Sequence, residues 1–243
     1  MTTGLDHIDL KQADLHGIKI ISIPGYATTA TAEYTMSLIL SLIRKIPFAF
    51  EHFKKEKWER HKFLGSELEG KTIGIVGFGR IGTRVGKYAN AFGMNVIFFD
   101  PYFDEKIPRD FPYKRVMSLE DLLTHSDVTT LHTVLSNETE KMINKNSMSK
   151  MKKGAVIVNA SRGMIIDESD LVEALENGTI AAAALDVFEE EPLPASHELI
   201  NYARSHDNLI LTPHIAGSTK ESINNAAKFV TDRIIEMLGG ENK

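Results

Sequence analysis

A GxGxxG motif at 77–82 constrains the fold of this chain more than any other feature of its sequence. An apolar stretch at 71–76 precedes the motif and is typical of a short strand, and residues 83–92 follow with a helical pattern. A second strand is expected at 95–99, ending on Asp100, 18 residues past the third glycine. The motif alone matches many ordinary turns, but this order of elements predicts a strand–helix–strand unit that binds a dinucleotide.

Each glycine of the motif has a physical role in such a unit. Gly77 permits the tight turn after the strand, and Gly79 lets a pyrophosphate approach the backbone closely. Gly82 lets the helix pack against the strand, so that the helix N-terminus faces the phosphates. Asp100 is placed to accept hydrogen bonds from the adenosine ribose hydroxyls. Because a carboxylate there would repel a 2′-phosphate, NAD is expected rather than NADP.

Length and composition describe a globular chain with an ordinary core. The chain has 243 residues, 42% of them hydrophobic, and a net charge of −5, which argues against nucleic acid as a partner. It contains no cysteine, which excludes disulfides and thiolate chemistry and is compatible with a reducing cytoplasm. The longest apolar stretch, near 36–46, is interrupted by polar residues and is too short to span a bilayer.

From residue 71 onward, short apolar strands alternate with helical patterns, as in a parallel α/β sheet. The expected strands after the motif lie at 127–132, 155–159, 181–187 and 208–212. The expected helices lie at 118–125, 147–151, 167–177 and 220–238, with Ser118 and Asp167 as N-caps. Six or so strands with right-handed crossovers predict a doubly wound sheet.

The first 70 residues follow another pattern. Residues 18–23 suggest a buried strand ended by a Pro-Gly pair, and residues 31–53 suggest one long helix bent near Pro47. No neighbouring strand is expected upstream of 18–23, and an unpaired strand edge is a liability. This segment is therefore interpreted as the last piece of a domain whose beginning is absent, with Met1 as a possible internal methionine of a longer chain.

Several motifs in one order resemble the NAD-dependent D-isomer-specific 2-hydroxyacid dehydrogenases, a family that includes phosphoglycerate, glyoxylate/hydroxypyruvate and D-lactate dehydrogenases. The resemblance covers nearly the whole chain. Its motifs are Gly-Leu-Asp-His-Ile-Asp at 4–9, Pro-Gly at 24–25 with Ala-Glu at 32–33, the glycine motif, Asn-Ala-Ser-Arg-Gly at 159–163, Ala-Leu-Asp-Val-Phe at 184–188 with Glu-Pro at 191–192, and Thr-Pro-His-Ile-Ala-Gly at 212–217.

The resemblance implies a domain division. Residues 1–30 would be the remnant of a flavodoxin-like substrate domain, 31–218 the NAD-binding Rossmann domain, and 219–243 a C-terminal helix that packs toward the substrate domain. The chain departs from the family pattern at 134–136, where Val-Leu-Ser replaces a usual Pro-Leu-Thr. That change is expected to loosen the loop under the nicotinamide without removing a catalytic group.

Three catalytic residues follow from the resemblance and from the chemistry of reducing a 2-keto acid. Arg162 would hold the substrate carboxylate, because a guanidinium forks onto a carboxylate and stays charged. His214 would donate the proton in reduction and accept it in oxidation. Glu191 is expected to pair with His214, stabilising the charged imidazole and fixing its tautomer. Without the family context, Arg162 would be interpreted as a surface arginine in a turn and Glu191 as part of a solvated acidic loop.

The remaining expected contacts are with the cofactor. Arg80 and Ile81 would offer backbone N–H groups to the pyrophosphate, and Asp186 would contact the nicotinamide carboxamide. Thr133 and Ala160 would line the nicotinamide side, next to His214. No metal site is expected, because Asp6, His7 and Asp9 lack a full ligand set and are interpreted as a turn and a helix cap.

Two function classes remain open from the sequence. The first is an oxidoreductase acting on a small D-2-hydroxy acid, and the second is an NAD-binding or interaction module without turnover, as in NAD-sensing corepressors of this fold. The helix and arm at 31–68 resemble the family's dimer interface, so a homodimer is expected. The sequence does not choose among 2-hydroxy acids.

Overall fold

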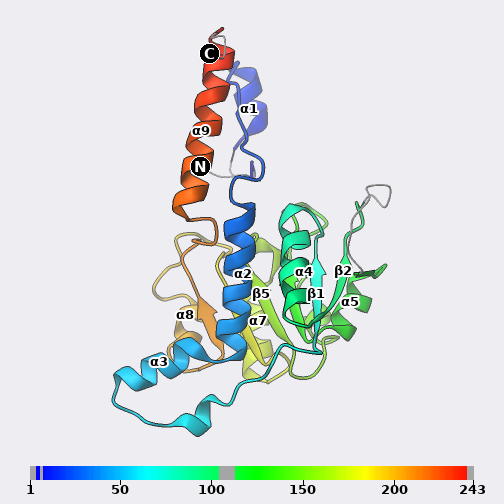
Figure 1. The fold of residues 1–243 in the computed structure, drawn as a ribbon, viewed down its shortest axis with the longest axis vertical. Helices are drawn as coiled ribbons and strands as arrows, with labels where there is room; N and C mark the ends of the chain where they lie inside the picture. Colours follow the sequence, from blue (N-terminus) through cyan, green and yellow to red (C-terminus); the bar gives the residue numbers. More distant parts are fainter. Residues whose placement is uncertain (1–3, 6–7, 104–112, 240–243) are drawn as a thin grey trace.

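The computed structural model describes residues 4–5, 8–103 and 113–239 and shows a parallel sheet between two layers of helices (Figure 1). In this described part, seven strands lie in the order β3-β2-β1-β4-β5-β6-β7. The strands are β1 (Thr72–Val76), β2 (Asn95–Phe99), β3 (Lys114–Arg115), β4 (Val128–Leu131), β5 (Val156–Asn159), β6 (Ala182–Leu185) and β7 (Leu209–Leu211). Each neighbouring pair is parallel, which confirms the predicted doubly wound α/β fold.

The two faces of the sheet are covered by different helices. One core cluster joins the sheet to α2 (Thr28–Ile43) and α4 (Arg80–Ala91). The other cluster joins the opposite face to four short helices, which are α5 (Leu119–His125), α6 (Lys145–Met148), α7 (Glu168–Glu176) and α8 (Glu198–Ala203). All four residues of both β4 and β5 are buried, as expected for central strands of a parallel sheet covered on both sides.

Local capping defines several helix starts where the sequence predicted them. Ser118 Oγ accepts a hydrogen bond from Asp121 N at 3.1 Å, and Asp167 Oδ1 accepts one from Asp170 N at 3.1 Å. These side chains satisfy backbone donors that the first helical turn leaves without partners. Both predicted N-caps are therefore confirmed.

The predicted strand at 18–23 is wrong. These residues form no ladder with any described strand, and Ile18 is 62% exposed whereas Ile23 is buried. A strand requires a neighbour to satisfy its backbone groups, and the described sheet ends at β7 on one side and β3 on the other. The segment is an extended connection instead.

The predicted single helix at 31–53 is two helices. The first, α2, ends at Ile43, and Lys45 adopts the left-handed conformation with φ of 55° before α3 (Ile46–Lys54) begins. Pro47 lies in the first turn of α3, where its missing N–H costs nothing. In a continuous helix its ring would clash with the carbonyl of Ile43. The short edge strand β3 was not predicted, because two residues carry no periodicity.

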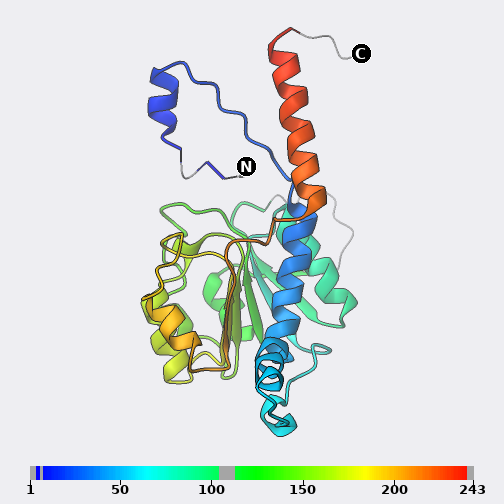
Figure 2. The same cartoon turned by 90° about the vertical axis from the view of Figure 1, so that its left-hand side faces the viewer.

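Two helices extend beyond the sheet. The C-terminal α9 (Lys220–Met237) starts at a Thr219–Ser222 capping box, and only Ser222 and Ala226 of its described residues are buried. In the view of Figure 1, α9 is drawn next to α1 (Leu10–Leu15), whereas the turned view in Figure 2 shows the two helices apart. Asp9 caps α1 as predicted, and Asp6 and His7 lie outside the described residues. None of the described helices is both long and apolar enough to cross a membrane.

His132, directly after β4, carries an imidazole enclosed by the protein. Its Nε2 lies 3.0 Å from Thr130 Oγ1, and its Nδ1 is buried without a hydrogen-bond partner in the described part of the chain. Burial lowers the pKa of His132 from 6.5 to about 3. In the unfolded chain His132 therefore binds a proton near pH 6.5, whereas in the folded chain it binds one only near pH 3.

We predict that His132 makes the fold less stable as the pH falls below about 6.5. The limiting slope for one proton is about 1.4 kcal/mol per pH unit. Because His132 as a whole residue is only half-buried, the expected loss of unfolding free energy between pH 7.5 and 5.5 is about 1 kcal/mol. Urea unfolding of His132→Asn at both pH values should lack this loss, and His61→Asn, which removes an exposed imidazole, is the control. Equal pH dependence in the wild type and His132→Asn would contradict the prediction.

Candidate functional site

The parallel register aligns the last residues of six strands in one row across the sheet. The row consists of Phe99, Val76, Leu131, Asn159, Leu185 and Leu211, each paired with the next. Segments carrying the predicted site residues follow this row directly: Gly77, Asp100, Thr133, Ala160, Arg162, Asp186 and His214. The chain order reverses between β1 and β4, and ligands of open α/β sheets bind at such a switch point, beyond the carboxyl ends of the strands.

The glycine motif forms the turn between β1 and α4. Gly77 has φ of 85°, a conformation in which a side chain would be strained, and a Cβ there would lie 2.7 Å from the His132 carbonyl carbon. Gly79 is the N-cap of α4 and has open space where a Cβ would be. A Cβ at Gly82 would instead overlap the Gly77 carbonyl oxygen. Gly82 therefore serves packing, and Gly79 leaves room above the backbone.

The start of α4 provides a place for an anion. Arg80 and Ile81 occupy its first turn, where backbone N–H groups lack helical partners and the helix dipole favours negative charge. The Arg80 side chain lies against Gly25, where a Cβ would be 3.3 Å from the Arg80 Nε. The segment before α2 therefore lies beside the glycine turn.

Asp100 lies beside the same turn. Its Oδ2 accepts a hydrogen bond from Phe78 N at 2.8 Å, and its Oδ1 accepts one from Tyr102 N at 2.9 Å. The carboxylate therefore stabilises the glycine turn. Its predicted contact with a ribose stays a prediction.

Thr133 and Ala160 lie at the ends of neighbouring strands. Thr133 N would be 2.7 Å from a Cβ on Gly77, so Thr133 is adjacent to the glycine turn, and Ala160 is 9% exposed. In the loop that follows, Thr139 Oγ1 accepts from Ser136 N at 2.8 Å and donates to Val134 O at 2.7 Å. Thr139 thus closes the loop in which the family proline is absent.

A buried asparagine shapes the turn that carries Arg162. Asn159 Oδ1 accepts from Ser161 N at 3.0 Å, and Asn159 Nδ2 donates to Arg162 O at 2.8 Å. Asn159 is 1% exposed, so its amide is committed to this turn. Gly163 follows, and a Cβ there would overlap the Phe188 carbonyl. The Arg162 turn and the loop that carries Glu191 are therefore in direct contact.

Glu191 and His214 form the predicted pair. His214 Nδ1 lies 2.7 Å from Glu191 Oε2, and Glu191 Oε1 accepts a hydrogen bond from Phe188 N at 3.0 Å. Both carboxylate oxygens thus have a partner, which fixes the direction of the Glu191 side chain. The His214 side chain is 47% exposed and that of Glu191 is 36% exposed. The second ring nitrogen, Nε2, is the one that remains for a ligand.

Asp186 holds the segment that carries His214. The residue is fully buried, and its carboxylate accepts from Thr212 Oγ1 at 2.6 Å, Ile215 N at 3.0 Å and Ala216 N at 2.8 Å. Burial raises the pKa of Tyr34, a residue of α2 near Thr212 and Asp186. The predicted contact of Asp186 with the nicotinamide stays a prediction.

Sequence reasoning missed the supporting roles of Asn159 and Asp186. Asn159 carried a usable signal, because a polar residue that ends an apolar strand is costly to bury without partners. Asp186 was recognised, but its bonds to a segment about 30 residues downstream have no local signature. In the described residues no group of three or more His, Cys, Asp or Glu side chains is arranged to hold a metal ion.

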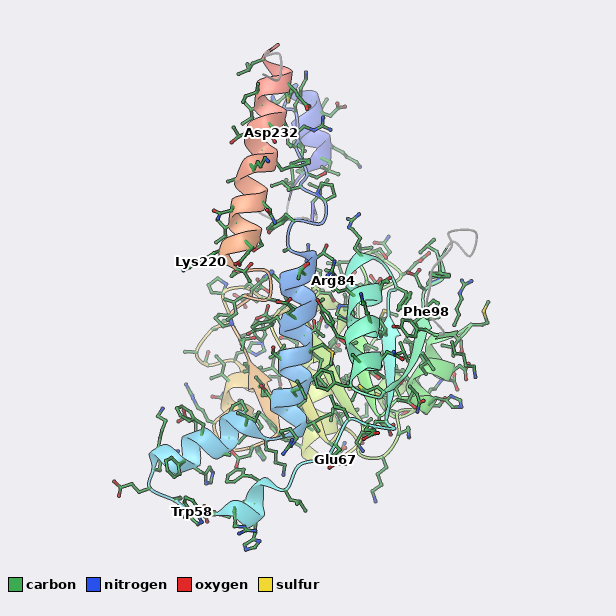
Figure 3. All side chains as sticks on the ribbon, viewed as in Figure 1. Trp58, Glu67, Arg84, Phe98, Lys220 and Asp232 are labelled. Carbon is green, nitrogen blue, oxygen red and sulfur yellow. The ribbon has the colours of Figure 1, made fainter. Side chains whose placement is uncertain are left out.

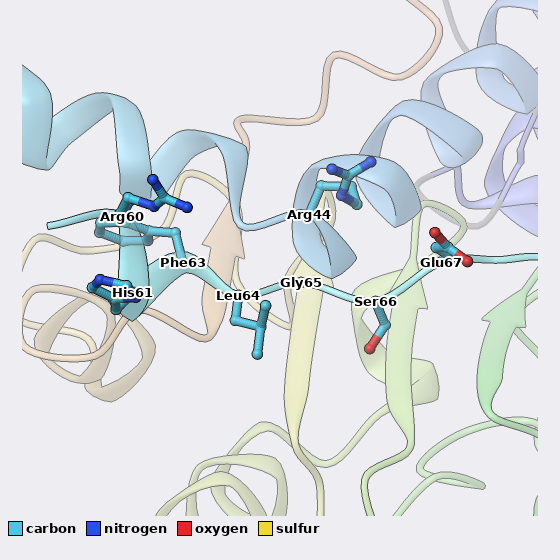
Figure 4. A pocket seen from close by; sticks show the side chains of 8 residues that line it. All are labelled: Arg44, Arg60, His61, Phe63, Leu64, Gly65, Ser66 and Glu67. Atoms are coloured by element: carbon cyan, nitrogen blue, oxygen red, sulfur yellow. The ribbon is translucent and has the colours of Figure 1, made fainter.

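A separate hollow of about 400 Å³ lies near the other end of α2, away from the strand ends (Figure 4). It is lined by Arg44, Arg60, His61, Phe63, Leu64, Gly65, Ser66 and Glu67. Because none of the predicted site residues lines it, this hollow is not part of the candidate site.

Gly79 and Gly82, at the start of α4, should affect different properties: Gly79 the affinity for NAD, and Gly82 the free energy of unfolding. Gly79→Ala should keep the free energy of unfolding within about 1 kcal/mol, because a Cβ meets nothing there. It should weaken NAD binding at least tenfold, because the methyl group occupies the approach to the backbone. Gly82→Ala should lower the unfolding free energy by about 1–3 kcal/mol through overpacking. Calorimetric NAD titration and urea unfolding of both variants provide the test, and unchanged affinity in Gly79→Ala would contradict it.

Comparisons with known proteins agree with this geometry. Residues 36–216 match the family model described as D-isomer specific 2-hydroxyacid dehydrogenase, NAD binding domain. D-3-phosphoglycerate dehydrogenase of Bacillus subtilis is 44% identical over 98% of this chain and 44% of its own length. Glyoxylate reductase of Thermofilum pendens is 38% identical over 99% of this chain and 71% of its own.

A solved structure shows the same fold. The D-lactate dehydrogenase of Aquifex aeolicus, complexed with NAD and lactic acid, has a TM-score of 0.86 and 33% identity, over 98% of this chain and 74% of that one. The chain thus spans less than half the length of the phosphoglycerate relatives it matches. It belongs to the D-isomer-specific 2-hydroxyacid dehydrogenases and carries their NAD-binding domain.

Proposed function

We propose that this chain is the coenzyme-binding part of an oxidoreductase that transfers a hydride between NAD(H) and a small D-2-hydroxy acid or 2-keto acid. The observation that carries the proposal is the 2.7 Å contact between His214 Nδ1 and Glu191 Oε2. Arg162 follows a strand end in the same row. A cation for the carboxylate and a histidine for the proton are what reduction of a 2-keto acid requires beyond the hydride.

NAD suits the residues at the switch point. Open space above Gly79, the start of α4 and the carboxylate of Asp100 together match a pyrophosphate and an adenosine ribose. Bound NADH would supply the hydride, and the protein would supply orientation and electrostatics. The carboxylate of Asp100 would repel the 2′-phosphate of NADP, which favours NAD.

The protein groups divide the remaining work. Arg162 would bind the substrate carboxylate through a bidentate ion pair. His214 would donate the proton on Nε2 to the carbonyl oxygen during reduction, and would accept it back during oxidation. Glu191, on Nδ1, would stabilise the imidazolium and keep Nε2 directed at the substrate. A hydride and a proton thereby convert the 2-keto acid into a 2-hydroxy acid.

The second candidate function is an NAD-binding module without turnover. It is favoured by the 47% exposure of His214 and by the limited span of the chain relative to its relatives. Catalysis in a cleft depends on excluding water and holding the substrate in position. A substrate domain would exclude water from the cleft and help to hold the substrate. We assign residues 1–30 to such a domain as a remnant, and we place residues 219–243 against it.

NADH oxidation separates the two candidates. The purified chain should oxidise NADH, followed at 340 nm, with pyruvate, glyoxylate, hydroxypyruvate or phosphohydroxypyruvate. His214→Ala should lower kcat by about 10²–10⁴-fold, because it removes the proposed acid–base. Turnover that survives in His214→Ala would refute the assigned mechanism, and NADH binding without any turnover would favour the second candidate.

We propose further that two copies of the chain associate through 31–68. Large apolar side chains of α3 and the following arm point away from the sheet, as Figure 3 shows for Trp58. Their exposed fractions are 55% for Ile46, 60% for Phe50, 62% for Phe53, 81% for Trp58 and 83% for Leu64. The rings of Phe53 and Trp58 lie edge to face with their centroids 6.1 Å apart. Several large apolar side chains exposed along one segment are typical of a protein interface. The lack of cysteine supports a cytoplasmic location for the assembly.

Light scattering coupled to gel filtration should give the mass of a dimer. Phe53→Glu, which introduces a charge into the proposed interface, should shift the dissociation constant at least tenfold toward monomer. Phe92→Glu is a matched control, because Phe92 is 46% exposed but follows α4, outside 31–68. A monomeric wild type, or equal effects of both variants, would contradict this interface.

A further inference from the structure

Glu168, the first residue of α7, is a buried carboxylate with no place in the proposed chemistry. It is 4% exposed, although it lies in the first turn of a helix where most acidic side chains are solvated. Burial raises the pKa of Glu168. Keeping a carboxylate in such a position is costly unless its oxygens are hydrogen-bonded.

The partners of Glu168 belong to the loop that carries Glu191. Glu168 Oε1 accepts a hydrogen bond from Glu189 N at 2.9 Å. In return, Glu189 Oε1 accepts one from Glu168 N at 3.3 Å. This reciprocal pair joins the start of α7 to the backbone two residues before Glu191.

A histidine on another helix faces the second oxygen of Glu168. His197 Nε2 lies 3.4 Å from Glu168 Oε2. His197 is the N-cap of α8, and its Nδ1 accepts a hydrogen bond from Leu199 N at 3.3 Å. Because Nδ1 is an acceptor there, the hydrogen of a neutral His197 ring lies on Nε2, the nitrogen that faces Glu168. Glu168 Oε1 thus accepts a hydrogen bond from Glu189 N, and Glu168 Oε2 faces a polar ring nitrogen.

A lysine compensates part of the negative charge. Lys141 Nζ lies 3.0 Å from Asp167 Oδ2 and 3.2 Å from Glu189 Oε1. These ion pairs raise the pKa of Lys141. Lys141 and Glu168 thus both hold Glu189 of the 188–191 loop. Gly163, in the Arg162 turn, packs against Phe188 of the same loop.

We infer that Glu168 is a positioning residue that holds the 188–191 loop so that Glu191 stays paired with His214. The inference rests on the proposed roles of Glu191 and His214. Three contacts connect Glu168 to His214. Glu168 Oε1 accepts a hydrogen bond from Glu189 N, and Glu191 Oε1 accepts one from Phe188 N within the same loop. Glu191 Oε2 then lies 2.7 Å from His214 Nδ1. Glu168 acts through this chain of contacts and does not meet the substrate.

The His214 tautomer reports directly on this role. At pH 8.5, nitrogen NMR of ¹⁵N-histidine-labelled protein distinguishes the Nδ1–H form, which donates to Glu191, from the Nε2–H form. His214→Ala assigns the signal, and Glu191→Ala, which removes the acceptor, defines the spectrum of the broken pair. The measurement needs neither substrate nor turnover, so it tests Glu168 even if the chain proves to be a binding module.

We expect Glu168→Ala to move the His214 spectrum at least halfway toward that of Glu191→Ala and to speed amide exchange at Glu189 at least tenfold. Glu168→Gln keeps one acceptor for Glu189 N and should give a smaller change in both measurements. Glu173→Gln, the same change on the exposed side of α7, should leave both unchanged.

Three outcomes would overturn the inference. The first is a Glu168→Ala protein that melts at a lower temperature with the His214 spectrum unchanged, because Glu168 would then support only the fold. The second, should Glu168→Ala fail to fold, is a wild-type His214 spectrum and Glu189 exchange rate in Glu168→Gln. The third is an unchanged His214 spectrum in Glu191→Ala, because the pair would then be absent in solution.

Discussion

The common direction of the strands is the constraint on which the rest of this structure depends. Because each described strand pair is parallel and in register, the residues that follow the strands reach one edge of the sheet. Residues more than a hundred positions apart in the sequence, such as Gly77 and His214, therefore lie on the same edge. No single segment could bring a phosphate-binding turn, a guanidinium and an imidazole together. The crossover helices are what allow it.

Buried carboxylates connect this edge to the layers beneath it. Asp186 accepts three hydrogen bonds and Glu168 accepts one from the backbone of Glu189, and bonds to a charged group contribute about 1.5–3 kcal/mol each. Such bonds offset the cost of keeping the charge away from water. Asp186 holds the segment around His214, and Glu168 holds the loop of Glu191. The two members of the proposed proton relay thus have separate anchors in the interior.

The sequence predicted the sheet well, because its periodicity, glycines and caps are local. It failed where the outcome depends on neighbours in space. The 18–23 segment has the composition of a strand but no partner to pair with, and the helix expected through Pro47 breaks at Lys45. The pairing of Glu191 with His214 was predicted from resemblance. The bonds from Asp186 to Ile215 and from Glu168 to Glu189 were not, because a residue type alone does not name a distant partner.

His214 has φ of 51°, a left-handed conformation that is unfavourable for a residue with a side chain. The hydrogen bonds of Asp186 to the two amides that follow His214 offset this cost of about 1 kcal/mol or more. The backbone at His214 is therefore a fixed pivot, and only the side-chain torsions are left to move the ring. When His214 changes between its protonated and neutral states, the imidazole can therefore move only by a small rotation about its side-chain torsions. The contact with Glu191 restricts that rotation.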